Sequence, residues 1–247
     1  MMATTQAPVD KQQQQPQPPR RGAFIVFEGI DRCGKSTQTA LLAASLPNSL
    51  LRRFPDRTTK TGAIISSYLS HPSSSSASSP SAAATPSPPL PDEAIHLLFS
   101  ANRWESAASL TALLRAGTNV IVDRYAYSGA AYTAAKGGGG GGGGVAGGLG
   151  LEWCKAPDRG LPTPDLVVYV DVAPAVAAAR AGYGEERYER IEFQEKVAAA
   201  FAELRDERWV VVDGTRPVEE VQRTIEKVAR EVVAKAGMEP LREDLWC

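Results

Sequence analysis

Cysteine is scarce in this chain of 247 residues. There are three, Cys33, Cys154 and Cys247, and no two of them form a CxxC pair. An odd, widely spaced set of this kind does not supply the paired ligands of a zinc site or the framework of a disulfide-rich secreted domain. We expect free thiols in a reducing compartment, most simply the cytosol, with nuclear or organellar forms left open.

Long apolar runs and an excess of one charge are also missing. No run approaches the roughly 20 apolar residues of a bilayer-spanning helix, and the N-terminus has no apolar signal segment. The 27 Lys and Arg residues nearly balance the 28 Asp and Glu residues, for a formal net charge of -1. The sequence therefore gives no reason to expect a nucleic acid or a membrane as a partner, and favours a soluble, cytoplasmic protein that acts on a small molecule.

Three segments have a biased composition. Residues 1–21 are rich in Gln and Pro, residues 71–91 in Ser, Ala and Pro, and residues 137–150 in Gly. Such segments cannot bury enough apolar surface to offset the entropy lost on ordering. We expect a disordered tail at 1–21, a single domain over 22–236 interrupted by loop insertions at about 71–91 and 137–150, and a C-terminal tail at 237–247.

Apolar strands and helical patterns alternate between these segments, which predicts an α/β fold. The runs AFIVF, NVIVD, LVVYVD and WVVVD are apolar almost to their ends, as in strands buried on both faces. They lie at residues 23–27, 119–123, 166–171 and 209–213, with a weaker fifth strand near 49–54. Helices are expected at residues 35–46, 59–69, 92–116, 174–180, 189–207 and 217–236. This order predicts a five-stranded parallel sheet flanked by helices, with ligands beyond the carboxyl ends of its strands.

The first expected strand leads directly into GIDRCGKS, residues 29–36, which fits the phosphate-binding pattern GxxxxGK[ST]. Backbone N–H groups of such a loop surround the β-phosphate, the lysine reaches the β and γ oxygens, and the serine hydroxyl is offered to Mg²⁺. The expected ATP-binding residues are Gly29, Ile30, Asp31, Arg32, Cys33, Gly34, Lys35, Ser36 and Thr37.

The loop is unusual in carrying two charged residues, Asp31 and Arg32, between its glycines. A phosphate-binding loop alone indicates only a nucleoside triphosphate, since switches, motors and small-molecule kinases share it. A guanidinium at Arg32 can bridge the donor and acceptor phosphates, whereas a GTPase typically receives its arginine elsewhere. The simpler alternative is that Arg32 is a solvated loop cation.

The remaining motifs carry a family resemblance. FEGIDRCGKST, RFPDR, HLLFSANRWE, DRYAYSGAAYT, WCKAPDRGLPTPDLV and ERYE with FQE follow one another from residue 27 to residue 195. In this order they resemble the eukaryotic thymidylate kinases, over residues 22 to about 236 apart from the two insertions. The resemblance implies the fold of a P-loop nucleoside monophosphate kinase with a lid, transfer of the γ-phosphoryl group of ATP to dTMP in dTTP synthesis, Mg²⁺, and a homodimer.

Phe99 and Arg103 stand four residues apart on one expected helix, so that a ring and a guanidinium share a face. Taken alone, such a pair is more often a core residue beside a solvated charge. By resemblance, Phe99 stacks on thymine and Arg103 donates to its O4. Arg57 and Arg124 are the expected clamps of the dTMP phosphate, because a planar guanidinium matches two phosphate oxygens.

Further roles are implied by the resemblance. Asp31 bonds the sugar 3′-hydroxyl, and Asp123 organises Mg²⁺ and the phosphate-binding arginine, although an Asp after a strand also serves as a helix cap. Ser128 and Gly129 lie at the thymine edge. Tyr132 presses on the sugar near C2′ and excludes a ribose hydroxyl, unless it is only a packed aromatic residue.

Residues 180–189 combine two glycines with charges between helical stretches and are interpreted as a lid that excludes water. By resemblance Arg180 lies against adenine, and Tyr188 and Gln194 reach toward dTMP. Arg187 offers a second cation near the transferred group, but the expectation rests on Arg32. The expected catalytic residues are Arg32, Lys35, Asp123 and Arg124, and the expected Mg²⁺ residues are Ser36 and Asp123.

Two other functions stay open at this point. Another nucleoside monophosphate kinase, such as a UMP/CMP or guanylate enzyme, is disfavoured by Phe99, Arg103 and Tyr132. A non-catalytic nucleotide-binding protein or GTP switch is disfavoured because the sequence has no guanine-reading NKxD motif.

Overall fold

The computed structural model describes residues 20–70, 90–137, 149–180 and 187–247. Residues 1–19 of the predicted N-terminal tail, most of both insertions and most of the predicted lid, with Glu185 and Glu186, lie outside these ranges. Over the described ranges, no helix has both the length and the apolar character needed to cross a membrane.

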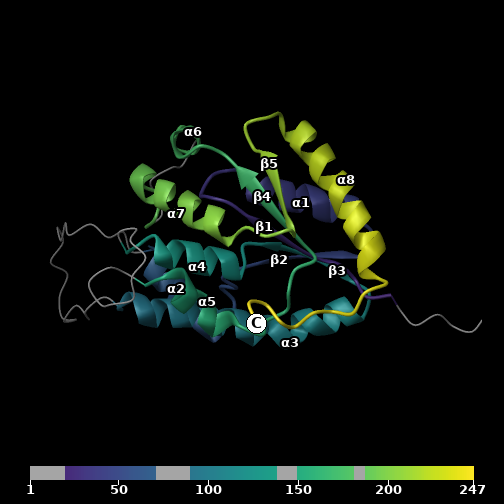
Figure 1. Cartoon of the computed structure of the whole chain (residues 1–247), viewed down its shortest axis with the longest axis horizontal. Helices are drawn as coiled ribbons and strands as arrows, with labels where there is room; N and C mark the ends of the chain where they lie inside the picture. Colours follow the sequence, from purple (N-terminus) through teal and green to yellow (C-terminus); the bar gives the residue numbers. More distant parts are fainter. Residues whose placement is uncertain (1–19, 71–89, 138–148, 181–186) are drawn as a thin grey trace, which may run out of the picture.

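Five parallel strands form one sheet in the described part of the chain, as predicted (Figure 1). They are β1 (Phe24–Glu28), β2 (Ser49–Arg53), β3 (Asn119–Asp123), β4 (Leu166–Asp171) and β5 (Trp209–Asp213). Their order is β2-β3-β1-β4-β5, so β1 lies in the middle and its carboxyl end meets those of β3 and β4. Every residue of β1 and β3 is buried, as expected for strands covered on both faces.

The predicted burial of the run WVVVD, residues 209–213, on both faces is wrong. β5 is an edge strand, and only Val212 of its five residues is buried, while Val211 is 45% exposed. An edge strand has a neighbour on one side alone, so an apolar composition does not guarantee burial there. β2 forms the opposite edge and is likewise partly exposed.

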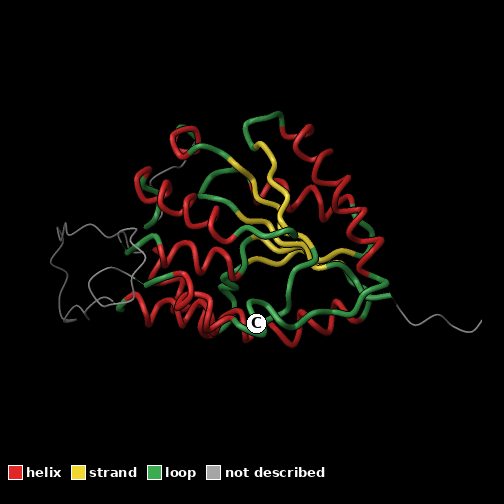
Figure 2. The backbone as a smooth tube through the Cα atoms, in the orientation of Figure 1, coloured by secondary structure: helices red, strands yellow, loops and turns green. Residues whose placement is uncertain are grey.

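Helices cover both faces of the sheet (Figures 1 and 2). α1 (Lys35–Ser45) and α8 (Val218–Ala236) pack together on one face, and α3 (Asp92–Arg115), α4 (Ala126–Ala134) and α7 (Ile191–Leu204) lie on the other. The remaining helices are α2 (Lys60–Ser70), α5 (Leu151–Lys155), α6 (Pro174–Ala178) and the short 3₁₀ helix η1 (Ala156–Asp158). The six predicted helices are all present, with ends that differ by a few residues.

Two α-helices of the described chain, α4 and α5, were not predicted, and neither was η1. α4 has the sequence AYSGAAYTA and is buried on nearly all sides, so it has no polar face to produce an amphipathic pattern. It carries Ser128, Gly129 and Tyr132, which all line one cavity. α5 directly follows the Gly-rich run and has only five residues.

The segment after α8 is packed against the domain. Residues 237–247 run back from the end of α8 past α3 toward α5 (Figure 1), and Leu245 is fully buried. At the other end of the described chain, the two terminal nitrogens of Arg21 donate to the two carboxylate oxygens of Asp165, at 2.8 and 2.7 Å. The expected C-terminal tail is therefore in contact with the rest of the domain.

Candidate active site

The phosphate-binding loop lies between β1 and α1, as the sequence predicts. Gly29 and Gly34 have φ values of 145° and 104°, which L side chains rarely adopt. A Cβ on Gly29 would also come within 2.8 Å of the Val170 carbonyl oxygen. Lys35 is buried beneath the loop, and its Nζ donates to the Ile30 carbonyl oxygen at 2.5 Å.

A polar cavity opens beside this loop. Its lining includes Asp31, Arg32, Gly34, Lys35, Ser36, Thr37, Arg53, Asp123, Arg124 and Arg180. Five of these carry a positive charge, so the cavity suits the phosphates of a nucleotide.

Ser36 and Asp123 meet at the floor of this cavity, where the Ser36 hydroxyl donates to Asp123 Oδ2 at 2.7 Å. Across the described ranges there is no group of three His, Cys, Asp or Glu residues able to hold a metal by themselves. Mg²⁺ commonly takes one or two protein oxygens and completes its shell with phosphates and water. The hydroxyl and carboxylate oxygens present here fit that requirement.

Arg32 is held by residues that were not predicted to hold it. Its Nε donates to Glu189 Oε1 at 2.7 Å, and Arg180 donates from a terminal nitrogen to the Arg32 carbonyl oxygen at 2.7 Å. Glu189 is nearly inaccessible to solvent, whereas the side chain of Arg32 is 30% exposed. The only sequence signal for Glu189 is its place in the ERYE motif.

A second hollow continues from the phosphate cavity along α1. Gly34, Thr37 and Arg180 line both spaces, and the lining of the outer one also includes Gly214, Thr215 and Val218. Arg180 is fixed there by donating to the Gly214 carbonyl oxygen at 2.9 Å. Arg180 therefore lies where the two spaces adjoin.

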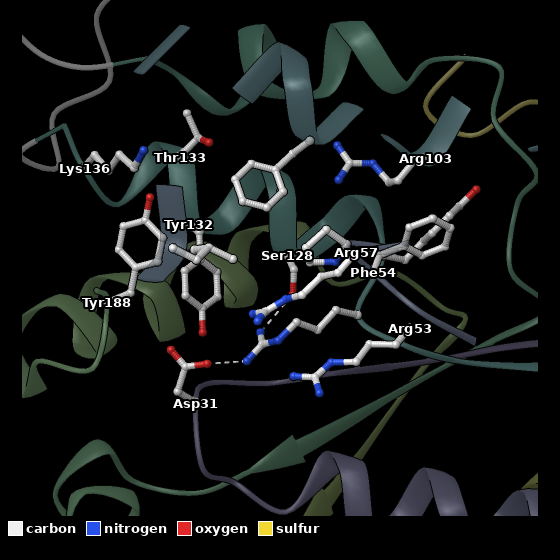
Figure 3. Close-up of a pocket in the computed structure, with 16 residues that line it drawn as sticks. Asp31, Arg53, Phe54, Arg57, Arg103, Ser128, Tyr132, Thr133, Lys136 and Tyr188 are labelled. Carbon is white, nitrogen blue, oxygen red and sulfur yellow. Dashed lines mark hydrogen bonds and ion pairs between the residues drawn. The ribbon is translucent and has the colours of Figure 1, made fainter. Parts of the chain in front are cut away.

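The acceptor cavity lies on the other side of Asp31 (Figure 3). It brings together nine of the ten residues predicted to bind the acceptor, namely Asp31, Arg57, Phe99, Arg103, Arg124, Ser128, Gly129, Tyr132 and Tyr188. Arg57 and Arg103 enter from one side and Tyr132 and Tyr188 face them from the other. Gln194 does not line this cavity.

Arg103 is positioned by a buried carboxylate. Its Nε and one terminal nitrogen donate to the two oxygens of Asp158 at 3.0 and 2.5 Å, and the two side chains are 3% and 0% exposed. The guanidinium lies against Gly129, where a Cβ would stand 2.8 Å from a terminal nitrogen. Asp158 was missed because the sequence shows no link between this loop and α3.

Arg124 and Asp31 form an ion pair on the wall of the cavity (Figure 3). The other terminal nitrogen of Arg124 donates to the Gly29 carbonyl oxygen and to Ser128 Oγ, each at 3.2 Å. The guanidinium carbon also lies 5.2 Å from the centre of the Tyr132 ring. Arg124 has a φ of 68°, so the backbone itself turns this residue away from the path of β3.

Glu28, at the end of β1, is a functional candidate that the sequence reasoning missed. Its carboxylate accepts from the Tyr125 N–H at 2.9 Å, the Ser128 N–H at 3.1 Å and the Ser128 hydroxyl at 2.5 Å. Burial raises the pKa of Glu28, while these donors and Arg124 oppose the change. The Ser128 hydroxyl is therefore directed at Glu28, although Ser128 borders the cavity as predicted. The available signal was the Glu of the FEG motif at a strand end.

Asn102 holds the loop that carries Arg57. Its side-chain oxygen accepts from the Asp56 N–H at 2.7 Å, and its amide nitrogen donates to the Asp56 carbonyl oxygen at 3.0 Å and to Thr59 Oγ1 at 2.8 Å. Asn102 is fully buried on α3 beside Arg103. One helix therefore carries Arg103 and also holds the loop of Arg57.

Tyr188 lines the acceptor cavity, whereas Gln194 lies outside its lining. Gln194 is buried, donates to Asp31 Oδ2 at 2.7 Å and accepts from the Asp31 N–H at 3.0 Å. It contacts Asp31 from behind the cavity wall. Tyr188 borders the cavity, with its hydroxyl 2.8 Å from that of Tyr68.

The phosphate and acceptor cavities share part of their walls. Asp31, Arg53 and Arg124 line both, so the two spaces meet between the ends of β1, β2 and β3. Arg53 was not predicted to be part of the site, although it begins the RFPDR motif. Lys35 and Phe99 thus face adjoining spaces of one cleft.

Comparisons with known proteins agree with this geometry. A family model described as thymidylate kinase matches residues 27–225. The thymidylate kinase of Arabidopsis thaliana is 47% identical over 86% of this chain and 73% of that one, and the Homo sapiens thymidylate kinase is 40% identical over 92% and 98%. A solved structure of thymidylate kinase from Candida albicans superposes with a TM-score of 0.73 at 35% identity, covering 91% of this chain and 96% of that one. With the family model spanning most of its length, the chain belongs to the thymidylate kinase family.

Proposed function

We propose that the chain is a dTMP kinase, which transfers the γ-phosphoryl group of ATP to dTMP and yields dTDP and ADP. The observation that carries this proposal is the shared wall of Asp31, Arg53 and Arg124 between a phosphate cavity and a cavity suited to a base. Direct transfer requires the two substrates to meet without an intervening barrier. The membership of the thymidylate kinase family supports the choice of substrates.

On the donor side, Lys35 and Arg32 are the proposed catalytic cations. Phosphoryl transfer depends mainly on alignment and charge stabilisation, and an acceptor phosphate is already largely ionised at neutral pH. No strong general base is then required. Thr37 and the loop N–H groups hold the donor phosphates, and Arg180 contacts the ATP base.

On the acceptor side, Arg57 and Arg124 hold the dTMP phosphate in line. Phe99 stacks on the base. Arg103 donates to a base carbonyl from the terminal nitrogen that does not bond Asp158. Tyr132 stands beside the sugar and disfavours a ribose. Asp31 is proposed to accept from the 3′-hydroxyl while remaining paired with Arg124.

Mg²⁺ is the proposed metal, held by Ser36 and Asp123 together with substrate phosphates. Its contribution when bound is to neutralise charge that develops on the phosphates. The chain's own part is the hydroxyl and carboxylate pair, 2.7 Å apart, at the end of β3 and the start of α1.

A coupled assay of ADP release tests the function across dTMP, dUMP, UMP and dCMP. The Candida albicans relative has broad substrate specificity, so the comparison of acceptors is needed. We expect dTMP to have the highest kcat/KM, with UMP disfavoured by Tyr132. Highest efficiency with UMP or dCMP would assign the chain to another pyrimidine monophosphate kinase activity. Nucleotide binding without transfer to any acceptor would contradict catalysis.

We also propose that the protein is a homodimer located in the cytosol. Leu97 and Trp104 stand seven residues apart on α3 and are 49% and 44% exposed, which supports an apolar contact along that helix. The three cysteines are all unpaired, which suits a reducing compartment. Sedimentation velocity tests the dimer, and a fluorescent fusion tests the compartment.

A further inference from the structure

The C-terminal segment makes an ordered contact with one loop of the domain. We call residues 241–246 the C-terminal strap and residues 156–163 the Asp158 loop. Gly160 N–H donates to the Leu245 carbonyl oxygen at 3.0 Å, and Leu245 N–H donates to the Leu161 carbonyl oxygen at 3.1 Å. Further along, Thr163 N–H donates to the Arg242 carbonyl oxygen at 2.9 Å. The strap is therefore paired with the loop as an additional extended segment would be.

Side chains fix the strap in that position. Leu245 is fully buried, and the Trp246 ring meets the Tyr127 ring edge-on with centroids 5.4 Å apart. The Thr163 hydroxyl donates to Asp244 Oδ1 at 2.8 Å. Glu243 accepts from Thr111 and Arg115 of α3, each at 3.0 Å. The strap thus joins the Asp158 loop to the same helix that carries Phe99 and Arg103.

The Asp158 loop decides where Arg103 points. Asp158 accepts from Arg103 through both oxygens and also from the Ser100 hydroxyl at 2.7 Å. A buried ion pair tolerates little displacement, because moving either partner leaves a desolvated charge without its counter-charge. Gly129 also lies against the guanidinium. Small shifts of the loop would consequently be transmitted to Arg103 and to the base-facing part of the acceptor cavity.

We propose that the C-terminal strap is a positioning element for pyrimidine recognition, acting through Asp158 on Arg103. The inference rests on the proposed function, since it takes the acceptor cavity to bind a pyrimidine nucleotide. The strap touches neither the reacting phosphates nor the phosphate-binding loop. Its loss should therefore weaken acceptor binding and base discrimination without slowing transfer at saturation.

Leu245→Ala tests the strap, and Ile225→Ala is its matched control. Ile225 is equally buried, but it lies on α8, which packs on α1, β4 and β5. Both substitutions should lower the melting temperature. Leu245→Ala alone should raise the dTMP KM by about tenfold, as expected when a hydrogen bond to a charged group is weakened, with kcat and the ATP KM unchanged. It should also reduce the preference for dTMP over dCMP.

A double-mutant cycle identifies the route. If the strap acts through Arg103, Leu245→Ala should add nothing to the dTMP KM of Arg103→Gln. Additive effects, or a dTMP KM for Leu245→Ala equal to that of Ile225→Ala, would overturn the proposal. If Leu245→Ala does not fold, Thr163→Val removes only the hydroxyl bond to Asp244. It should raise the dTMP KM by about threefold, and an unchanged value would count against the strap.

One measurement separates this inference from the proposed function. Hydrogen exchange at Arg103 Nε, followed by NMR in the substrate-free protein, reports the Asp158 pair directly. We expect faster exchange in Leu245→Ala than in Ile225→Ala, whatever the substrate proves to be. Equal exchange with normal dTMP kinase activity would remove the strap and keep the function. Faster exchange in a protein without activity toward dTMP would keep the effect of the strap on Arg103 and remove the proposed function.

Discussion

Arg32 and Glu189 form an ion pair in the lining of the phosphate cavity, with 2.7 Å between Arg32 Nε and Glu189 Oε1. Glu189 lies two residues before α7, at the end of the segment interpreted from sequence as a lid. The guanidinium in the phosphate-binding loop is therefore tied to the part of the chain expected to close over the phosphates. Its position and the position of that segment depend on each other.

Arg32→Ala should lower kcat far more than it raises the ATP KM. An arginine at the transferred phosphoryl group contributes about 10³ to 10⁵ in rate in related reactions. Steady-state kinetics with dTMP saturating measures the effect, and Arg32→Lys tests whether charge alone suffices. A raised ATP KM with normal turnover would remove Arg32 from this role.

Gly129→Ala should weaken acceptor binding. The added Cβ would stand 2.8 Å from a terminal nitrogen of Arg103, which is itself locked to Asp158. We expect the dTMP KM to rise by about tenfold, the equivalent of one disturbed charged hydrogen bond, with the ATP KM unchanged. Gly150→Ala is the matched control, because a Cβ there meets nothing within 4 Å. An unaffected KM in Gly129→Ala would mean that Arg103 does not read the base.

Removing divalent metal should abolish transfer, and Mg²⁺ should restore it. Ser36→Ala removes the hydroxyl that lies 2.7 Å from Asp123 Oδ2. We expect the Mg²⁺ concentration for half-maximal activity to increase by about tenfold, through loss of one oxygen ligand. Activity is measured in EDTA-treated enzyme titrated with MgCl₂. Thr39→Val is a control on the same helix, since its hydroxyl bonds the Ser36 carbonyl oxygen. An identical Mg²⁺ dependence in Ser36→Ala would contradict the assignment.

Glu28 should make the protein less stable as the pH rises through the acidic range. Burial raises the pKa of Glu28 above its ordinary value of 4.5, so the folded state binds the proton more tightly than the unfolded state. Stability then falls with increasing pH, from just below that ordinary value until the folded pKa is passed. Denaturant unfolding of wild type and Glu28→Gln at several pH values isolates this contribution.

The difference in unfolding free energy, wild type minus Glu28→Gln, should decrease over that window and level off above it. Other carboxyls, including Asp56 and Asp206, have lowered pKa values and act in the opposite direction, but they are common to both proteins. A difference that stays constant from pH 4 to pH 8 would show that Glu28 does not carry the shifted pKa.

The sheet and the phosphate-binding loop could be predicted from sequence because local chemistry determines them. Runs such as NVIVD are apolar and β-branched, which predicts buried strands. A loop that fits GxxxxGK[ST] between a strand and a helix is typical of phosphate binding. α4 could not be predicted in this way, because a buried helix of small residues lacks the polar face that reveals helical periodicity. The prediction that β5 is buried failed for a related reason, because composition does not distinguish an edge strand from a central one.

The candidate site was predicted best where a residue faces the cavity. Arg57, Phe99 and Tyr132 lie where the motifs suggested, and their roles in binding stay predictions. The residues that were missed stand behind them: Glu28 under Ser128, Asp158 under Arg103, and Asn102 under the Arg57 loop. These partners are brought together by long-range folding, so no spacing in the sequence connects them.

The burial of Leu245 has a practical consequence for anyone expressing this enzyme. A purification tag or fusion partner joined to Cys247 would begin three residues after Leu245, whose side chain is fully buried in the domain. A linker at that end is attached close to the packed segment, whereas a cleavable tag placed ahead of Met1 does not alter the C-terminal strap. Kinetic constants collected from the two formats should not be pooled until they have been compared.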